Sequence, residues 1–126
     1  MKKLRVLLLE PDKILGRSYA TALETAGCVV DWATTAEGAV RLADIHTPNI
    51  AVVELQIAQH NGVEFLYEFK SYSEWMDVPV VIHTVLRPEE IVRIADLPKG
   101  LGIVATLHKS HTSLTQLCDA TRELAQ

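Results

Sequence analysis

The segment Pro48–Gly62, PNIAVVELQIAQHNG, contains an apolar run, Ile50–Val53, that ends at an acid, Glu54. A short apolar run between turn residues is typical of a buried strand in a parallel sheet. The loop that follows closes on Asn61-Gly62, after which a new helix is expected. Open parallel sheets bind ligands outside the carboxyl ends of their strands, so Glu54 is the first candidate site residue.

Four further runs with strand character flank this segment, and each strand precedes a stretch with helical periodicity. The expected strands cover residues 4–9, 28–32, 50–53, 78–84 and 102–107. The expected helices begin near residues 13, 34, 62, 87 and 110, and the first four end near residues 26, 45, 72 and 97. This alternation predicts an α/β fold with right-handed crossovers and a doubly wound, five-stranded parallel sheet. The length of 126 residues fits one domain, residues 1–126.

Local signals predict how the helices begin and which faces they bury. Thr34 and Glu37 have the spacing of a capping box, and residues 110–112 are expected to cap the last helix. Gly27 supplies the stop of the first helix. The inward faces are predicted from a period of 3.6 residues. Their members are Leu15, Tyr19, Ala22, Leu23 and Ala26 in the first helix, Val63, Leu66, Tyr67 and Phe69 in the third, and Leu114, Leu117, Cys118, Thr121 and Leu124 in the last.

Charge and hydropathy exclude several classes of function. The net charge is −4 and the basic residues are scattered, which argues against direct nucleic-acid binding. No apolar run approaches the roughly 20 residues that span a bilayer, and residues 1–9 are too short for a secretory signal. We therefore expect a cytoplasmic protein without membrane contact. Cys28 and Cys118 are isolated, which predicts two buried, reduced thiols.

The carboxyl ends of the five expected strands bring together Glu10, Asp12, Glu54, Thr84 and Lys109. With this set the chain resembles, over its whole length, the receiver domain of bacterial two-component response regulators. LLLEPD stands at the family's apolar strand and acidic pair, and VVELQIAQHNG at its phosphoacceptor Asp and the loop after it. The resemblance implies a flavodoxin-like (βα)5 fold with strand order 2-1-3-4-5, and a signalling role without enzymatic activity.

In the family, an acidic pair and the acceptor Asp hold Mg²⁺, while a Lys and a Thr receive the phosphoryl group. Here the acceptor position holds Glu54, whose extra methylene adds about 1.5 Å of bond length. A misplacement of about 1 Å costs on the order of 100-fold in rate where geometry matters. Pro11 takes the second acidic place, and Asp12 is expected to point elsewhere or to cap the first helix. We expect neither phosphorylation nor bound Mg²⁺, and no cofactor.

Three positions around the switch also depart from the family pattern. Val85 follows Thr84 where the family has a small residue, so its side chain should narrow the entrance to the pocket. Thr106 stands where an aromatic residue swings inward on activation, and Ser110 replaces the Pro that follows the Lys. The sequence therefore predicts a pocket that keeps the general shape of the family's site but lacks the residues that move on activation.

An ion pair between Glu54 and Lys109 is expected, because an unpaired, partly buried Lys would cost several kcal/mol. Two interpretations of this pair stay open. In one it is purely structural and closes the end of the sheet. In the other, Glu54 imitates a phosphorylated Asp and holds the domain in one signalling state.

Other interpretations are weaker. His83, His108 and His111 lie near the same rim, but no two of them have the i, i+4 spacing of helical metal ligands, and His83 should face away from Thr84. A flavodoxin-like cofactor binder would need a Gly-rich or hydroxyl-rich phosphate loop after the first strand, where residues 10–13 are EPDK. Trp32 and Trp75 are interpreted as packing residues.

The sequence thus predicts an atypical receiver that acts in signal transduction through a protein partner or a second copy. By resemblance, its contact face is the fourth helix, fifth strand and fifth helix, about residues 89–123. The alternative is a working, phosphorylation-dependent receiver that controls an attached DNA-binding output domain. We expect that the natural chain can continue into such a domain beyond Gln126.

Overall fold

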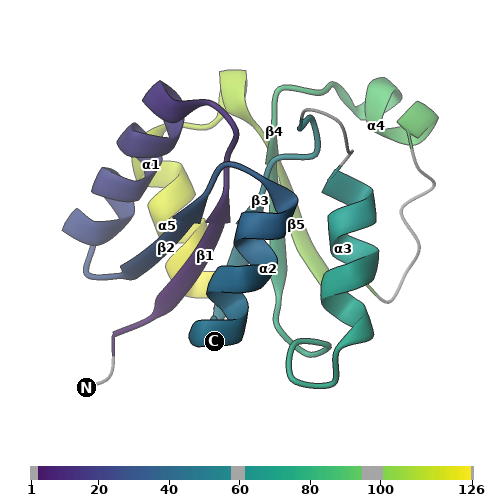
Figure 1. Ribbon diagram of the computed structural model, residues 1–126. Coiled ribbons are helices and arrows are strands. Elements are labelled where there is room, and N and C mark those ends of the chain that lie inside the picture. The colour runs from purple at the N-terminus through teal and green to yellow at the C-terminus, as the bar shows by residue number, and fades with distance from the viewer. Residues whose placement is uncertain (1–2, 58–61, 95–100, 126) are drawn as a thin grey trace.

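A computed structural model describes residues 3–57, 62–94 and 101–125 of the protein (Figure 1). In chain order its elements are β1 (Arg5–Leu9), α1 (Lys13–Thr25), β2 (Val29–Ala33), α2 (Ala36–Ile45), β3 (Ile50–Val53), α3 (Gly62–Ser71), β4 (Val80–Thr84), α4 (Pro88–Ile94), β5 (Ile103–His108), the 3₁₀ turn η1 (Lys109–His111) and α5 (Leu114–Leu124). The strands form one parallel sheet in the order β2-β1-β3-β4-β5, so the predicted fold class and strand order are confirmed.

The sheet separates two apolar cores, because successive side chains of a strand point to opposite faces. Ile50 and Val52 of β3 pack toward α1 and α5, whereas Ala51 and Val53 pack toward α2 and α3. All four side chains are at most 1% exposed, which explains the uninterrupted apolar run of β3. Figure 1 shows α1 and α5 together on one side of the sheet and α2, α3 and α4 on the other.

The register of the strands places the acidic residues side by side. Leu9 at the end of β1 pairs with Val53 at the end of β3, so the next residues, Glu10 and Glu54, leave the sheet at the same level. The backbone N–H of Glu54 donates to the carbonyl of Leu9 at 3.0 Å. On the other side of β3, β4 ends at Thr84, which pairs with His108 of β5.

Two helix caps differ from prediction. Thr35, not Thr34, caps α2: its hydroxyl accepts the N–H of Gly38 at 3.0 Å, because β2 extends to Ala33 and leaves Thr34 in the turn. The cap of α5 is Ser113, which forms a capping box with Gln116, because η1 occupies the residues before it.

The predicted end of α4 near residue 97 and the Asn of the Asn61-Gly62 pair lie outside the described residues.

Three predicted inward residues are exposed instead. Leu15, Tyr67 and Leu114 are 37%, 52% and 46% exposed. Helical periodicity identifies which residues share a face, but packing against the sheet sets how the helix is rotated. In α1 the inward face includes Gly16, which lies directly against the indole of Trp32, and a Cβ built there would come within 2.2 Å of the ring. In α3, Phe65 takes the buried place expected for Tyr67.

Both tryptophans pack, as predicted. Trp75 is 2% exposed and stacks on Phe69 with ring centroids 5.1 Å apart. Cys28 and Cys118 are free and buried, also as predicted. Among the helices of the described residues, none is long and apolar enough to cross a bilayer.

The connection from α3 to β4 is held by one ammonium group. Lys70 Nζ donates to the carbonyl oxygens of Trp75 at 3.3 Å, Met76 at 3.2 Å and Val78. A Cβ at Gly102 would lie 2.9 Å from this nitrogen, and φ of Gly102 is +70°, so glycine suits that position doubly. Burial lowers the pKa of Lys70, and nearby Asp77 opposes the shift.

Replacing Lys70 with Met should destabilise the fold, because three carbonyls would lose their shared donor. We expect the free energy of unfolding in urea to fall by about 1–3 kcal/mol. The matched control is Lys13→Met, because Lys13 is exposed, and it should change the same quantity by less than about 0.5 kcal/mol. Equal effects of the two substitutions would contradict the bracing role of Lys70.

Candidate functional site

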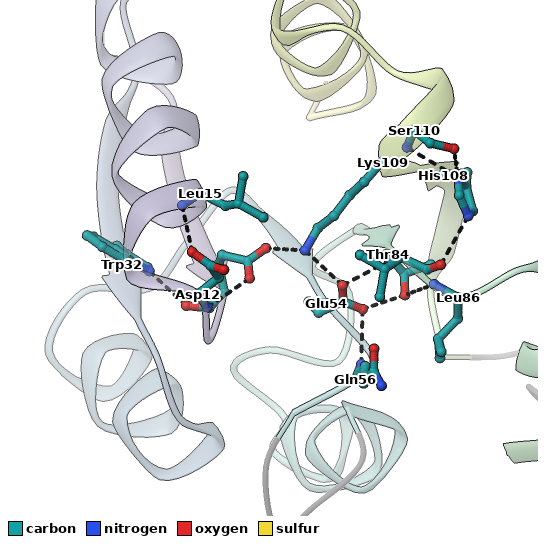
Figure 2. Close-up of polar contacts among 12 residues, drawn as sticks. Asp12, Leu15, Trp32, Glu54, Gln56, Thr84, Leu86, His108, Lys109 and Ser110 are labelled. Atoms are coloured by element: carbon teal, nitrogen blue, oxygen red, sulfur yellow. Dashed lines mark hydrogen bonds and ion pairs between the residues drawn. The ribbon is translucent and has the colours of Figure 1, made fainter.

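Four polar side chains meet at the carboxyl end of the sheet, and Figure 2 labels Glu54, Thr84 and Lys109 among them. Glu10 follows β1, Glu54 follows β3, Thr84 ends β4 and Lys109 follows β5. Glu10, Glu54 and Thr84 are at most 3% exposed, and the Lys109 side chain is 8% exposed. The structure therefore brings together these four of the five predicted residues in a buried cluster.

Lys109 links the two acids. Its Nζ lies 2.5 Å from Glu10 Oε1 and 2.8 Å from Glu54 Oε1, so the predicted pair with Glu54 is confirmed and has a second carboxylate. Burial opposes the positive charge of Lys109, but hydrogen bonds to Glu10 and Glu54 outweigh it and raise the pKa. The ammonium group therefore stays charged inside the site.

Glu54 accepts four hydrogen bonds. Oε1 accepts from Lys109 Nζ and from the backbone N–H of Val85 at 3.0 Å. Oε2 accepts from the backbone N–H of Gln56 at 3.0 Å and from the hydroxyl of Thr84. A carboxylate has about four lone-pair sites, so both oxygens are fully engaged. The Thr84 hydroxyl in turn accepts the N–H of Leu86 at 3.1 Å.

Glu10 and Asp12 have separate tasks. Glu10 Oε2 accepts the backbone N–H of Asp12 at 3.0 Å, which leaves its other oxygen for Lys109. Asp12 Oδ1 accepts the N–H groups of Ile14 and Leu15, both at 2.9 Å, so Asp12 caps α1, the second of the two predicted roles. Pro11 stands between the two acids and carries no side-chain oxygen.

Sequence reasoning missed the backbone donors and one side chain. The N–H groups of Gln56 and Val85 complete the shell of Glu54, and backbone amides leave no signature in a sequence. The indole N–H of Trp32 donates to the carbonyl of Glu10 at 3.0 Å. The only sequence signal for this bond was a large polar-tipped residue at the end of the neighbouring strand.

The remaining predicted positions lie around the cluster. The Val85 side chain is 45% exposed, at the rim, and Thr106 is exposed on β5 in register with Ile82. Ser110 Oγ lies 2.6 Å from His108 Nδ1, and His108 Nε2 lies 3.1 Å from the carbonyl oxygen of Val85.

His83 packs on the opposite side of the sheet from Thr84. Its ring meets that of Tyr19 edge-on, with centroids 4.7 Å apart, and Lys109 Nζ lies 5.7 Å from the same Tyr19 ring. Burial, reinforced by the charge of Lys109, lowers the pKa of His83 to about 4. His83 is therefore neutral near pH 7. The other two candidate histidines, His108 and His111, contact each other, with ring centroids 5.2 Å apart.

Comparison with known proteins relates the chain to a described family. The family model of the response regulator receiver domain matches residues 6–121. The chain is 30% identical over 95 residues to the KDP operon transcriptional regulatory protein KdpE of Escherichia coli, over 75% of this chain and 40% of that protein. It is 30% identical over 81 residues to the transcriptional regulatory protein QseB of Haemophilus influenzae, over 64% of this chain and 36% of that protein. The chain thus spans well under half of these relatives.

Solved structures share the fold at low sequence identity. A sensor protein from Polaromonas sp. JS666 superposes with a TM-score of 0.85 at 18% identity, covering 98% of this chain and 97% of that one. The chemotaxis protein CheY4 of Vibrio cholerae also superposes with a TM-score of 0.85 at 18% identity, covering 98% and 99%. These likenesses concern the fold alone.

The buried, neutral His83 should make stability depend on pH. Its pKa is about 4 when folded and 6.5 when unfolded, so the unfolded chain binds more protons between these values. The free energy of unfolding that neutral His83 contributes is therefore fully present well above pH 6.5. It is lost as the pH falls toward 4, by about 2–3 kcal/mol. Urea unfolding at several pH values should show that His83→Leu removes this part of the slope. An unchanged slope in that variant would contradict the assignment.

Proposed function

The chain belongs to the response regulator receiver domain family, and we propose that it is an atypical member that signals through protein contacts without being phosphorylated. In this proposal the domain has no catalytic activity of its own and works in the cytoplasm. Its partner is another protein or a second copy of the chain. The carrying observation is the fully occupied carboxylate of Glu54 at the acceptor position.

A phosphoacceptor needs an oxygen that is free to attack phosphorus in line. Both oxygens of Glu54 are held by donors, including the ammonium group of Lys109 and the hydroxyl of Thr84. Hydrogen bonds to a charged group contribute about 1.5–3 kcal/mol each, so freeing one oxygen for attack is costly. This supports a site that does not accept phosphate.

The family's chemistry requires Mg²⁺, and the oxygen ligands at this site fit that ion poorly. Mg²⁺ takes octahedral oxygen ligands at about 2.0–2.1 Å. Pro11 offers no side-chain oxygen, Asp12 caps α1, and Glu10 is held by Lys109 and a backbone N–H. We propose that the positive charge of Lys109 takes the place that a metal would otherwise fill.

The contacts of Thr84 favour the interpretation of Glu54 as a built-in phosphate mimic. In the family, the Lys and Thr at these positions receive a phosphoryl group. Here Lys109 and Thr84 both donate to the carboxylate of Glu54. The same contacts are also compatible with a purely structural pair, so an experiment on signalling state must separate the two.

The proposed contact face comprises α4, β5 and α5, as the family resemblance implies. Within its described residues it exposes apolar side chains: Val92 is 73% and Val104 45% exposed. Thr106 of β5 and Leu114 at the start of α5 are exposed as well. A face of this kind suits a partner protein or a second copy.

A second candidate function is a phosphorylation-dependent receiver that controls a DNA-binding output domain. KdpE and QseB are named as transcriptional regulatory proteins, and the matched region is 40% and 36% of their lengths. The missing acceptor Asp argues against this candidate.

The two candidates differ in phosphate uptake. With acetyl phosphate and Mg²⁺ in millimolar excess, we expect intact-protein mass spectrometry to detect no added phosphate on the wild type. The double variant Pro11→Asp, Glu54→Asp restores an acceptor and a second acid, and it should become labelled. Phosphate on wild-type Glu54 would overturn the proposal in favour of the second candidate.

The interpretation of Glu54 as a phosphate mimic predicts that Glu54→Gln changes the proposed contact face of α4, β5 and α5 while the fold is kept. The amide cannot neutralise Lys109 or accept as strongly from Thr84, so NMR shifts should change at Thr84 and along β5 and α5. Self-association measured by analytical ultracentrifugation should change with them. Glu37→Gln, at an exposed acid, is the matched control. A well-folded Glu54→Gln variant with unchanged shifts beyond its direct contacts and unchanged association would leave only the structural pair.

A further inference from the structure

A cavity that is widely open to solvent lies away from the acidic cluster, where the start of α1, the end of β2 and one face of α2 meet. Its volume is about 570 Å³, and its lining includes Lys13, Arg17, Trp32, Arg41, Leu42 and Ile45. This volume falls in the range of about 300–1,000 Å³ that is usual for small-molecule sites. The acidic and hydroxyl groups of the Glu54 site do not line it.

The three charged residues that line the cavity in the described part of the chain are all basic. Lys13 and Arg17 are one helical turn apart on α1, so their side chains share a face. Arg41 enters from α2, where it pairs with Glu37 at 2.8 Å. That pair is worth little because both side chains are more than two-thirds exposed, so Arg41 can turn to another anion. Three cations around one cavity contrast with the net charge of −4.

The indole of Trp32 gives the cavity a fixed, flat wall. Gly16 of α1 lies against the ring, so closely that any larger residue there would collide with it. The indole N–H is bound to the carbonyl of Glu10 at 3.0 Å. An aromatic ring held in this way can bind another ring without losing side-chain freedom.

Helix α2 contributes an apolar part of the lining. Leu42 and Ile45 lie on the same face of α2 as Arg41, and Ile45 is 65% exposed although it is a large hydrophobic residue. The cavity therefore joins an aromatic surface, an apolar surface and a rim of three cations. A neutral apolar ligand would leave the cations unused, and a bare inorganic anion would leave the apolar walls unused.

We propose that this cavity binds a small organic anion that carries a flat ring. The ring packs on the indole of Trp32, the rest of its apolar surface contacts Leu42 and Ile45, and the negative group is held by Lys13, Arg17 and Arg41. A nucleoside monophosphate and an aromatic carboxylate share this chemistry. The proposal does not depend on how Glu54 functions, because the cavity and the acidic cluster have different linings.

The experiment is an NMR titration of the ¹⁵N-labelled protein with two probes, AMP and indole-3-acetate, at low and at physiological ionic strength. Adenosine and inorganic phosphate are the controls for ring and charge alone. We expect at least one probe to shift the Trp32 indole N–H and the amides of residues 13–17 and 38–45 in a saturable way. The two arms decide whether the anion is a phosphate or a carboxylate, and added salt should weaken binding.

Matched variants test the assigned residues. Arg17→Gln should weaken binding of the responding probe about tenfold, the typical effect of one charge-assisted contact. Arg122→Gln, at an exposed Arg on α5, should leave it unchanged. Ile45→Glu places a negative charge in the cavity and should abolish binding, whereas Ile14→Glu, at an 81% exposed position outside the lining, should not.

Two results would overturn the proposal. One is the absence of saturable shifts at Trp32 and α2 with both probes at millimolar concentration. The other is a response that phosphate or adenosine alone reproduces, or that Arg17→Gln and Arg122→Gln weaken equally, because either would indicate unspecific surface binding.

Discussion

The ammonium group of Lys109 lies between the buried carboxylates of Glu10 and Glu54, and the end of the sheet is organised around this contact. Two acids and one base leave an excess of negative charge that the interior tolerates only when every oxygen has a donor. Backbone N–H groups of Asp12, Gln56 and Val85 and the hydroxyl of Thr84 supply those donors. The carboxyl ends of four parallel strands are needed to bring all of them to one place.

This hydrogen-bonded network lies on a fold that proteins of low sequence identity share. Structures only 18% identical superpose on the chain with TM-scores of 0.85, because alternating apolar faces and right-handed crossovers are enough to set the architecture. The chemistry of the site depends on far fewer atoms. Pro11 carries no side-chain oxygen, and Lys109 and Thr84 both donate to the carboxylate of Glu54.

Trp32 contacts both the acidic cluster at the sheet end and the cavity between α1 and α2. Its ring lines the cavity between α1 and α2, while its N–H bonds to the backbone of Glu10, whose side chain contacts Lys109. Gly16 is the residue that makes this position available, since a side chain there would push the indole away. The proposed binding at the cavity and the charge arrangement at the sheet end therefore share one rigid side chain.

The sequence by itself determined the five-stranded parallel sheet, the two-sided burial of β3, and the meeting of Glu10, Glu54, Thr84 and Lys109, because apolar period and strand ends are local patterns with fixed geometric consequences. The strand order followed from the resemblance to the receiver family and not from these patterns. The sequence also limited Asp12 to two roles, of which the structure shows the helix cap. Tertiary structure alone decided the caps at Thr35 and Ser113 and the exposure of Leu15, Tyr67 and Leu114. It alone decided the backbone donors around Glu54 and the cavity beside Trp32. These features depend on how each helix is rotated and how far each strand pairs, and contacts between residues distant in the chain set both.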